Sequence, residues 1–482
     1  MNTGGEAGCG PRRPGGRLTA LLLLAASSLA FGAPSAAWAE TLKQALASTY
    51  GYYPALVAQR ARLRATDENV PIARSGYLPT IGATGTINYQ NTHNRPDPNN
   101  SNGELYPQQY QGTIAQNLFN GFQTRNAVNA AEAQVRSGRE TLRDTERTVL
   151  LQAVTAYMDV VRDTALVGLQ ESNVQVLSRE LKATKDRFAV GEVTKTDVAQ
   201  AEARRAGAVS QLDLARANLK TSRASYEQVV GHPPSNLHEP TPPEKLLPKS
   251  LANSIEVSAR ENPLVVAALY NEQAARFTVD QIRGQLLPSV DVQASISDTI
   301  EPSRFVKEST QGVVTGRLTI PLYEGGRVYA QVRQAKHTHV AALQAIEQAR
   351  TQVQQAVTQA WSQLQAARAQ LDSDRKQVEA NRTALAGVRE EERVGQRTLL
   401  DVLNAEQEYL NSQVSLVTDK RNLVVTAYSL LSQIGRLDAG YLNVAAEVYD
   451  PEIHYEEVRR KWFGLSITHS DGRREHFDAP MK

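Results

Sequence analysis

Two segments of the chain alternate between apolar and polar residues, which is typical of a β-strand with one apolar and one polar face. From Ile81 to Tyr89 the odd positions are apolar or small, and the even positions are mostly threonine and asparagine. In the second segment, Val290, Val292, Ala294 and Ile296 alternate with Asp291, Gln293, Ser295 and Ser297. We expect return strands at 110–119 and 312–323, joined by polar loops at 91–108 and 301–310.

A different periodicity fills the long stretches without proline, which run from Pro107 to Pro233 and from Pro321 to Pro451. Each is long enough for two helices and a turn. In the second, apolar residues recur at spacings of three and four, the seam of a coiled coil with one polar interruption. The seam is Val332, Ala335, His339, Ala342, Ile346, Ala349, Val353, Ala356, Ala360, Leu364, Ala367 and Leu371. A helix from residue 124 to 190 would be on the order of 100 Å long.

Each long helix is expected to end in a tight turn. Gly191 and Gly395 are stop signals, and each is followed by a threonine with an aspartate three residues later, ending at Asp197 and Asp401. That spacing predicts an N-cap with a capping acid. Return helices should end at glycines 231 and 435. Shorter helices are expected at 42–50 and 54–76, and again at 251–260 and 263–285, with proline at the start of the second member of each pair.

These elements occur twice, because the chain contains an internal tandem duplication. Pro54 and Pro79 match Pro263 and Pro288 at an offset of 209, and the hairpin turns match at an offset of 204. We therefore divide the chain into a first repeat at 40–231, a proline-rich linker at 232–250, a second repeat at 251–437, and a C-terminal tail at 438–482 that we expect in the periplasm.

Composition excludes several classes of function. Lysine plus arginine total 53 and aspartate plus glutamate 51, so no basic field exists to hold a nucleic acid. No phosphate-binding loop, zinc motif or nucleophile motif is present, so we expect no enzyme activity, cofactor or metal. His339 could suggest a metal or a pH sensor, but a polar residue within the seam explains it better.

Residues 1–39 form a predicted signal peptide. Arginines precede an apolar run at 18–31, and Ala37 and Ala39 are small residues suited to cleavage before Glu40. The only cysteine, Cys9, precedes that run, so no lipid-anchored cysteine is expected. No later segment is apolar enough for a spanning helix, so any membrane crossing must use strands.

Four strands cannot close a barrel, and open strand edges are not tolerated in hydrocarbon. Other copies of the chain must therefore complete the sheet. Two copies would give eight strands with a filled interior, and three would give twelve with a possible open lumen. The pattern thus predicts a conduit.

The repeated motifs resemble those of the TolC family of outer-membrane efflux and type I secretion channels. The motifs are the prolines that open the strands, L-F-x-G-F and L-Y-x-G-G before the long helices, and V-G-x-x-T-x-x-D-V at both hairpins; the resemblance covers 41–437. It implies an α+β membrane protein of the outer membrane. Its four transmembrane strands would form a twelve-stranded barrel in a homotrimer, and its coiled-coil hairpins a periplasmic tunnel.

The same resemblance implies partners and a gate. Such channels receive cargo from an inner-membrane RND or ABC transporter through a periplasmic adaptor. The entrance would lie at the hairpin tips, with an arginine of one hairpin pairing with an aspartate of the other. Our candidate gate residues are Thr196, Asp197, Glu392, Arg397, Asp401 and Asn404.

We hypothesise that Arg397 pairs with Asp197 across protomers and that Asp401 contributes to a ring of carboxylates in the lumen. Asn404 replaces an acid and Glu392 a tyrosine that the family can carry. The alternative for both aspartates is that they only cap their helices. An alternative for the whole chain is a periplasmic coiled-coil adaptor or scaffold that spans no membrane. The sequence does not identify the cargo.

Overall fold

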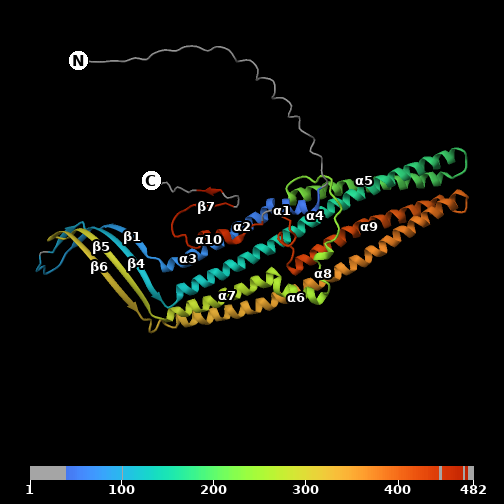
Figure 1. The fold of residues 1–482 in the computed structure, drawn as a ribbon. Coiled ribbons are helices and arrows are strands. Elements are labelled where there is room, and N and C mark those ends of the chain that lie inside the picture. The colour runs from blue at the N-terminus through green and yellow to red at the C-terminus, as the bar shows by residue number, and fades with distance from the viewer. Residues whose placement is uncertain (1–39, 100, 445–447, 470–472, 476–482) are drawn as a thin grey trace, which may run out of the picture. The chain divides into compact units, whose positions relative to one another are not determined.

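The computed structural model describes residues 40–99, 101–444, 448–469 and 473–475. The predicted signal peptide lies outside them. Within the described part, a sheet lies at one end of a set of long helices and the helical hairpin tips lie at the other (Figure 1). No described helix is long and apolar enough to cross a membrane.

The sheet is antiparallel and has the order β1-β4-β5-β6. Its strands are β1 Thr80–Ile87, β4 Gln108–Asn120, β5 Ser289–Ser303 and β6 Val306–Thr319. β1, β4 and β5 begin within two residues of the predicted positions. The prediction of 312–323 for the last strand was wrong, because β6 begins at Val306 and ends at Thr319. That strand ends before Pro321, which has no N–H to donate to a ladder.

The predicted loops also need correction. The second, at 301–310, is largely strand, because Ser303 pairs with Val306 across a two-residue turn. Its polar residues continue the ladder instead of leaving it. The first loop contains a small hairpin of β2 Gln90–Thr92 and β3 Gly103–Leu105. Polar composition therefore indicated exposure correctly but did not indicate where pairing stops.

The long helices confirm the helical prediction. α4 Gln123–Ala189 and α8 Arg327–Arg393 each have 67 residues, and α5 Lys195–Val230 and α9 Leu399–Ile434 each have 36. α4 packs along α5, and α8 packs along α9. The predicted seam of α8 is buried at every position from Ile346 to Leu371 except Ala356, and Val357 is fully buried where Ala356 was expected.

Shorter helices connect the sheet to these hairpins. The first repeat has α1 Leu42–Tyr52, α2 Pro54–Asp67 and α3 Asn69–Arg74, so the helix predicted at 54–76 is broken after residue 67. The second has α6 Leu251–Glu261 and an unbroken α7 Pro263–Arg283. α7 packs against both α4 and α8 and so joins the repeats. The 3-10 turns η1 Ser75–Tyr77 and η3 Gly284–Leu286 lead into the strands.

The largest apolar core lies where α1, α4, α5 and α9 meet. Tyr157 and Tyr226 are fully buried there. The Tyr157 hydroxyl lies 2.7 Å from the carbonyl oxygens of Glu40 and His238, so it holds the linker against α4. The linker has one short turn, η2 Glu244–Leu246.

After α9 the tail returns over the first repeat. It contains α10 Pro451–Val458 and the short strands β7 Ile467–Thr468 and β8 Arg474–Glu475. Ala439, at its start, and Leu437, just before it, are fully buried. The tail is therefore an integrated part of the fold at least up to α10.

Candidate functional site

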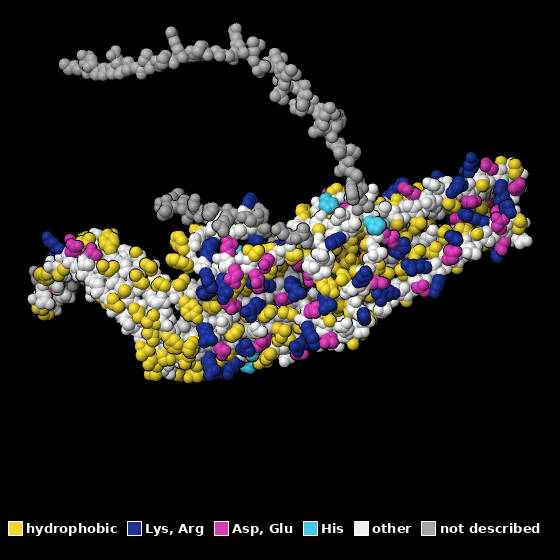
Figure 2. Space-filling view, in the orientation of Figure 1, with side chains coloured by type: hydrophobic (Ala, Val, Ile, Leu, Met, Phe, Trp, Pro, Cys, Tyr) yellow, Lys and Arg dark blue, Asp and Glu magenta, His cyan; other side chains and the backbone are white. Residues whose placement is uncertain are grey.

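The strand register sorts the sheet into two faces of opposite character. Ile81 pairs with Ile114, and Val292 and Ala294 lie in the neighbouring ladder on the same face. Many of these apolar side chains are exposed: Ile81 and Val314 are each 77% exposed, and Figure 2 shows hydrophobic side chains gathered over the strand end of the molecule. An exposed apolar face on a strand sheet is suited to hydrocarbon.

The opposite face is polar. It carries Thr84, Gln111, Ser297, Gln293 and Thr315, placed on one face by the ladder partners. Among the residues paired in these ladders on this face, only Asp291 and Arg317 are charged. A wall with these two faces can separate lipid from water.

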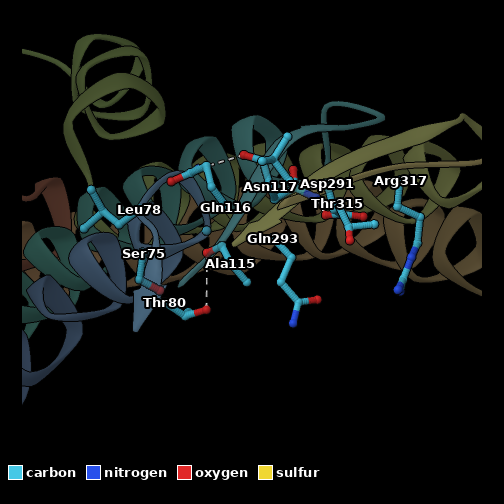
Figure 3. Close-up of a pocket in the computed structure, with 12 residues that line it drawn as sticks. Ser75, Leu78, Thr80, Ala115, Gln116, Asn117, Asp291, Gln293, Thr315 and Arg317 are labelled. Carbon is cyan, nitrogen blue, oxygen red and sulfur yellow. Dashed lines mark hydrogen bonds between the residues drawn. The ribbon is translucent and has the colours of Figure 1, made fainter. Parts of the chain in front are cut away.

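The base of the sheet holds a hollow of about 480 Å³ (Figure 3). Asn117, Asp291 and Arg317 lie opposite one another on three adjacent strands. Asn117 Nδ2 donates to Asp291 Oδ1 at 2.7 Å, whereas Arg317 points away from that pair in the close-up. The hollow is thus a polar recess at the helix end of the sheet.

The sheet is open at both sides within one chain. β1 and β6 are its two edge strands, and each has one partner only. Their unpaired N–H and C=O groups would each cost several kcal/mol in hydrocarbon. A membrane-embedded sheet of this kind requires further strands at both edges.

The hairpin turns have the predicted chemistry. Gly191 and Gly395 are left-handed, with φ of 82° and 78°. Asp197 accepts hydrogen bonds of 2.8 Å from the Thr194 backbone N–H and hydroxyl, and these bonds lower the carboxyl pKa. Asp401 accepts the same two bonds from Thr398, at 3.0 and 2.8 Å, with the same effect on its pKa. Both aspartates therefore cap helices as ionised groups.

Arg397 does not contact Asp197 in one chain. Its Nε lies 2.9 Å from Glu391 Oε2. Thr196 is exposed on the first turn of α5. The pairing of Arg397 with Asp197 between protomers stays a prediction, because one chain cannot display it.

Two contacts near the tips join the hairpins of the same chain. Arg187 Nη1 lies 2.7 Å from Glu392 Oε1, and Arg204 Nη2 donates to Asn404 Oδ1 at 2.8 Å. The pKa of Arg187 is raised, chiefly by its bond to Glu392. Sequence analysis found Glu392 and Asn404 but missed both arginines, since no local pattern links residues about 200 positions apart.

Away from these charged contacts, the two hairpins of the chain also meet through apolar side chains and through acidic side chains that lie close together. Leu177, Ala208 and Leu403 form a buried cluster that packs the two hairpins together. Glu406 pairs with Arg389, and burial followed by the charge of Glu406 raises the pKa of Glu180. The tips thus combine a packed contact with charged groups that lie close to one another.

The His339 Nε2 atom lies 2.6 Å from Glu272 Oε1 on α7. This histidine is half-buried in the seam, as expected of a polar seam residue. Within the residues that the structure describes, no group of three or more His, Cys, Asp or Glu side chains is placed to hold a metal.

Comparison with known proteins gives concordant matches. The family model described as outer membrane efflux protein matches residues 43–232 and 255–436. The chain is 40% identical to the outer membrane efflux protein BepC of Brucella suis, over 91% of this chain and 94% of that protein. It is 26% identical to the outer membrane protein TolC of Escherichia coli, over 84% of each. The CmeC outer membrane channel of Campylobacter jejuni has a TM-score of 0.73 at 15% identity, covering 87% of this chain and 89% of that one.

Proposed function

Because the chain belongs to the outer membrane efflux protein family, we propose that three copies of it build one duct across the outer membrane and the periplasm. The protein is an outer-membrane efflux channel. In our proposal its twelve strands, four from each copy, form the barrel and its hairpins form the tunnel.

The single observation that carries this proposal is the two-faced sheet with two open edges. One face is apolar and exposed, the other is polar, and β1 and β6 are unpaired on one side. Pairing β6 of one copy with β1 of the next satisfies both edges. Three copies leave an open lumen, whereas two would fill it with side chains.

The adaptor hypothesis is not supported. A periplasmic scaffold in water would not expose the apolar face of a four-stranded sheet. The relatives matched over most of the chain are outer-membrane proteins. Long helical hairpins alone would have fitted either class.

We propose that the hairpin tips are the periplasmic gate. Arg397 of one protomer would pair with Asp197 of the next, and Asp401 would face the lumen at the narrowest point. Asp197 keeps its charge because of its capping bonds, so it remains able to attract a guanidinium. The contact between Arg187 and Glu392 would hold each protomer's two hairpins together and thereby resist opening.

The partners follow from the same proposal. The chain carries no recognised site for using chemical energy, so transport would be driven by an inner-membrane RND or ABC transporter. A periplasmic adaptor would connect that transporter to the hairpin tips. Drug efflux and type I protein secretion both fit this arrangement.

Cysteine cross-linking tests the gate and the assembly together. The chain from residue 40 onward contains no cysteine, so Arg397→Cys with Asp197→Cys introduces the only pair. We expect oxidation to give covalent dimers and trimers on a denaturing gel. Each single variant is the control and should give neither covalent trimers nor a series of cross-linked species on the gel. A cross-link confined to the monomer would contradict pairing between protomers.

A further inference from the structure

The tail runs along the first repeat in a fixed direction. Ala439 N–H donates to Glu146 of α4 at 2.6 Å, Glu452 pairs with Arg139 at 2.9 Å, and Arg459 lies 3.9 Å from Glu132. The α4 partners thus move from residue 146 toward the start of that helix. Since α4 begins directly after β4, the tail advances toward the sheet.

Contacts with α2, α3 and α4 hold this path. His454 Nδ1 lies 2.9 Å from Asp67 Oδ2, and Asp67 is fully buried. Tyr455 packs on the cluster around Val70 and lies under the guanidinium groups of Arg139 and Arg459. α10 is therefore a fixed base for the segment that follows it.

After α10 the chain turns back. Thr468 in β7 accepts a hydrogen bond from Arg64 Nη1 at 2.9 Å, and Arg64 lies before Asp67 on α2. Residues 460–465 are consequently the apex of the turn, and Figure 1 shows this turn on the strand side of α10. Glu132, the last α4 partner, lies about 14 Å from the start of that helix at 1.5 Å per residue. The apex lies between that level and the sheet.

The apex has an unusual surface. Trp462 is 81% exposed and Phe463 is 85% exposed, with ring centroids 6.3 Å apart. Arg460 is exposed, and among the described residues no ion pair involves it. Lys461 Nζ donates to the Ser466 carbonyl at 2.6 Å, which closes the turn and leaves the ammonium charge uncompensated. No acidic residue occurs between 460 and 466.

We propose that residues 460–465 are an interfacial anchor that binds the periplasmic leaflet of the outer membrane. Trp462 and Phe463 enter the headgroup region, where amphipathic and aromatic rings are favoured. Arg460 and Lys461 pair with the phosphates of anionic phospholipids. The occupant is a lipid surface because the apex is cationic, aromatic and close to the sheet whose apolar face is exposed.

This anchor gives the tail a role that the channel proposal does not supply. It would fix the level of the helices relative to the membrane and add a contact outside the barrel. A second copy of the chain is the competing occupant of the same surface.

Tryptophan fluorescence tests the anchor. Downstream of residue 39 the chain has only Trp361 and Trp462. The Trp361→Phe variant of the chain from residue 40 is reconstituted into vesicles of phosphatidylglycerol and phosphatidylcholine, with or without bromine on the acyl chains. We expect brominated lipid to remove most of the Trp462 emission and acrylamide to quench it weakly.

Two further variants make the test specific. Arg460→Gln with Lys461→Gln should reduce quenching by brominated lipid, and more so when anionic lipid is present. Lys376→Gln with Arg382→Gln removes the same charge from exposed positions on α8 and should change nothing. Should Trp361→Phe disturb packing, subtracting the spectrum of Trp462→Phe from that of the unaltered chain isolates the same signal.

Three outcomes would contradict the anchor, and they differ in what they say about the channel. Trp462 quenched by acrylamide but not by brominated lipid, in protein that floats with the vesicles, would place the apex in water and overturn the anchor while leaving the channel intact. Trp462 shielded from both quenchers would place it against a second copy and would also overturn the anchor. Protein that does not float with the vesicles would overturn both the channel and the anchor.

Discussion

Single glycines shape the sharp turns between elements, and Gly121 has the least room for a side chain among them. It lies where β4 turns into α4, with φ of 63°. A Cβ at this position would lie 2.2 Å from the Gly284 carbonyl oxygen, in the turn that leads into β5. Two glycines from different repeats therefore bring backbone against backbone at the base of the sheet.

Gly121→Ala should destabilise the fold by at least about 2 kcal/mol, because it combines a left-handed backbone with a steric clash. Gly325 is the matching position of the second repeat, with φ of 64° and nothing within 4 Å of a Cβ. Gly325→Ala should cost about 1 kcal/mol, from the backbone alone. Denaturant unfolding of the solubilised protein measures both. Equal losses would show that the contact with Gly284 is unimportant.

Glu146 makes the fold sensitive to pH. Burial raises its pKa from 4.5 to about 7, although it accepts a hydrogen bond from Ala439 N–H. The folded chain holds this proton up to about pH 7, whereas the unfolded chain releases it near 4.5. The stabilisation is therefore complete below pH 4.5 and is lost as pH rises through 7.

We expect the unfolding free energy to fall by up to about 3 kcal/mol between pH 5 and pH 8 on account of this group. Glu146→Gln keeps the acceptor and removes the ionisation, so its stability should vary less with pH. Glu456 is exposed on α10, and Glu456→Gln is the control. A pH profile of Glu146→Gln identical to that of the unaltered chain would contradict this assignment.

At the scale of elements, sequence analysis predicted the features that depend on neighbouring residues, such as helix caps and helix ends. The capping boxes of Thr194 with Asp197 and of Thr398 with Asp401 are both formed, and the long helices begin and end within two residues of expectation. The end of β6 was missed, because alternation weakens there and only Pro321 marks the limit. The contact of Arg187 with Glu392 could not be predicted, since it depends on how two hairpins pack.

Thr398→Ala should loosen the start of α9 without unfolding it. Losing this N-cap costs about 1 kcal/mol, so amides in the first turn should exchange about fivefold faster. Thr194→Ala should have the same effect on α5. Thr196→Ala is the control, because Thr196 is exposed and is not the capping residue. Unchanged exchange in α9 would mean that packing alone holds the hairpin tip.

At the scale of the whole molecule, the duplication produces one sheet from two strand pairs. β4 of the first repeat pairs with β5 of the second, and the remaining edges are β1 and β6. Sequence analysis predicted strands, helices and the need for further copies, but not this pairing. Within one chain Arg397 pairs with Glu391, and Asp197 caps α5, so pairing between Arg397 and Asp197 stays a prediction about the assembly.

The central claim is that copies of this chain form a duct closed at the hairpin tips, and single-channel recording in a planar bilayer tests it most directly. The purified chain from residue 40 should give small, steady conductance steps. Arg397→Ala should give clearly larger steps, because it removes the guanidinium that we place in the closed gate. Equal steps from both proteins would contradict the gate, and the absence of any conductance from either would contradict the duct.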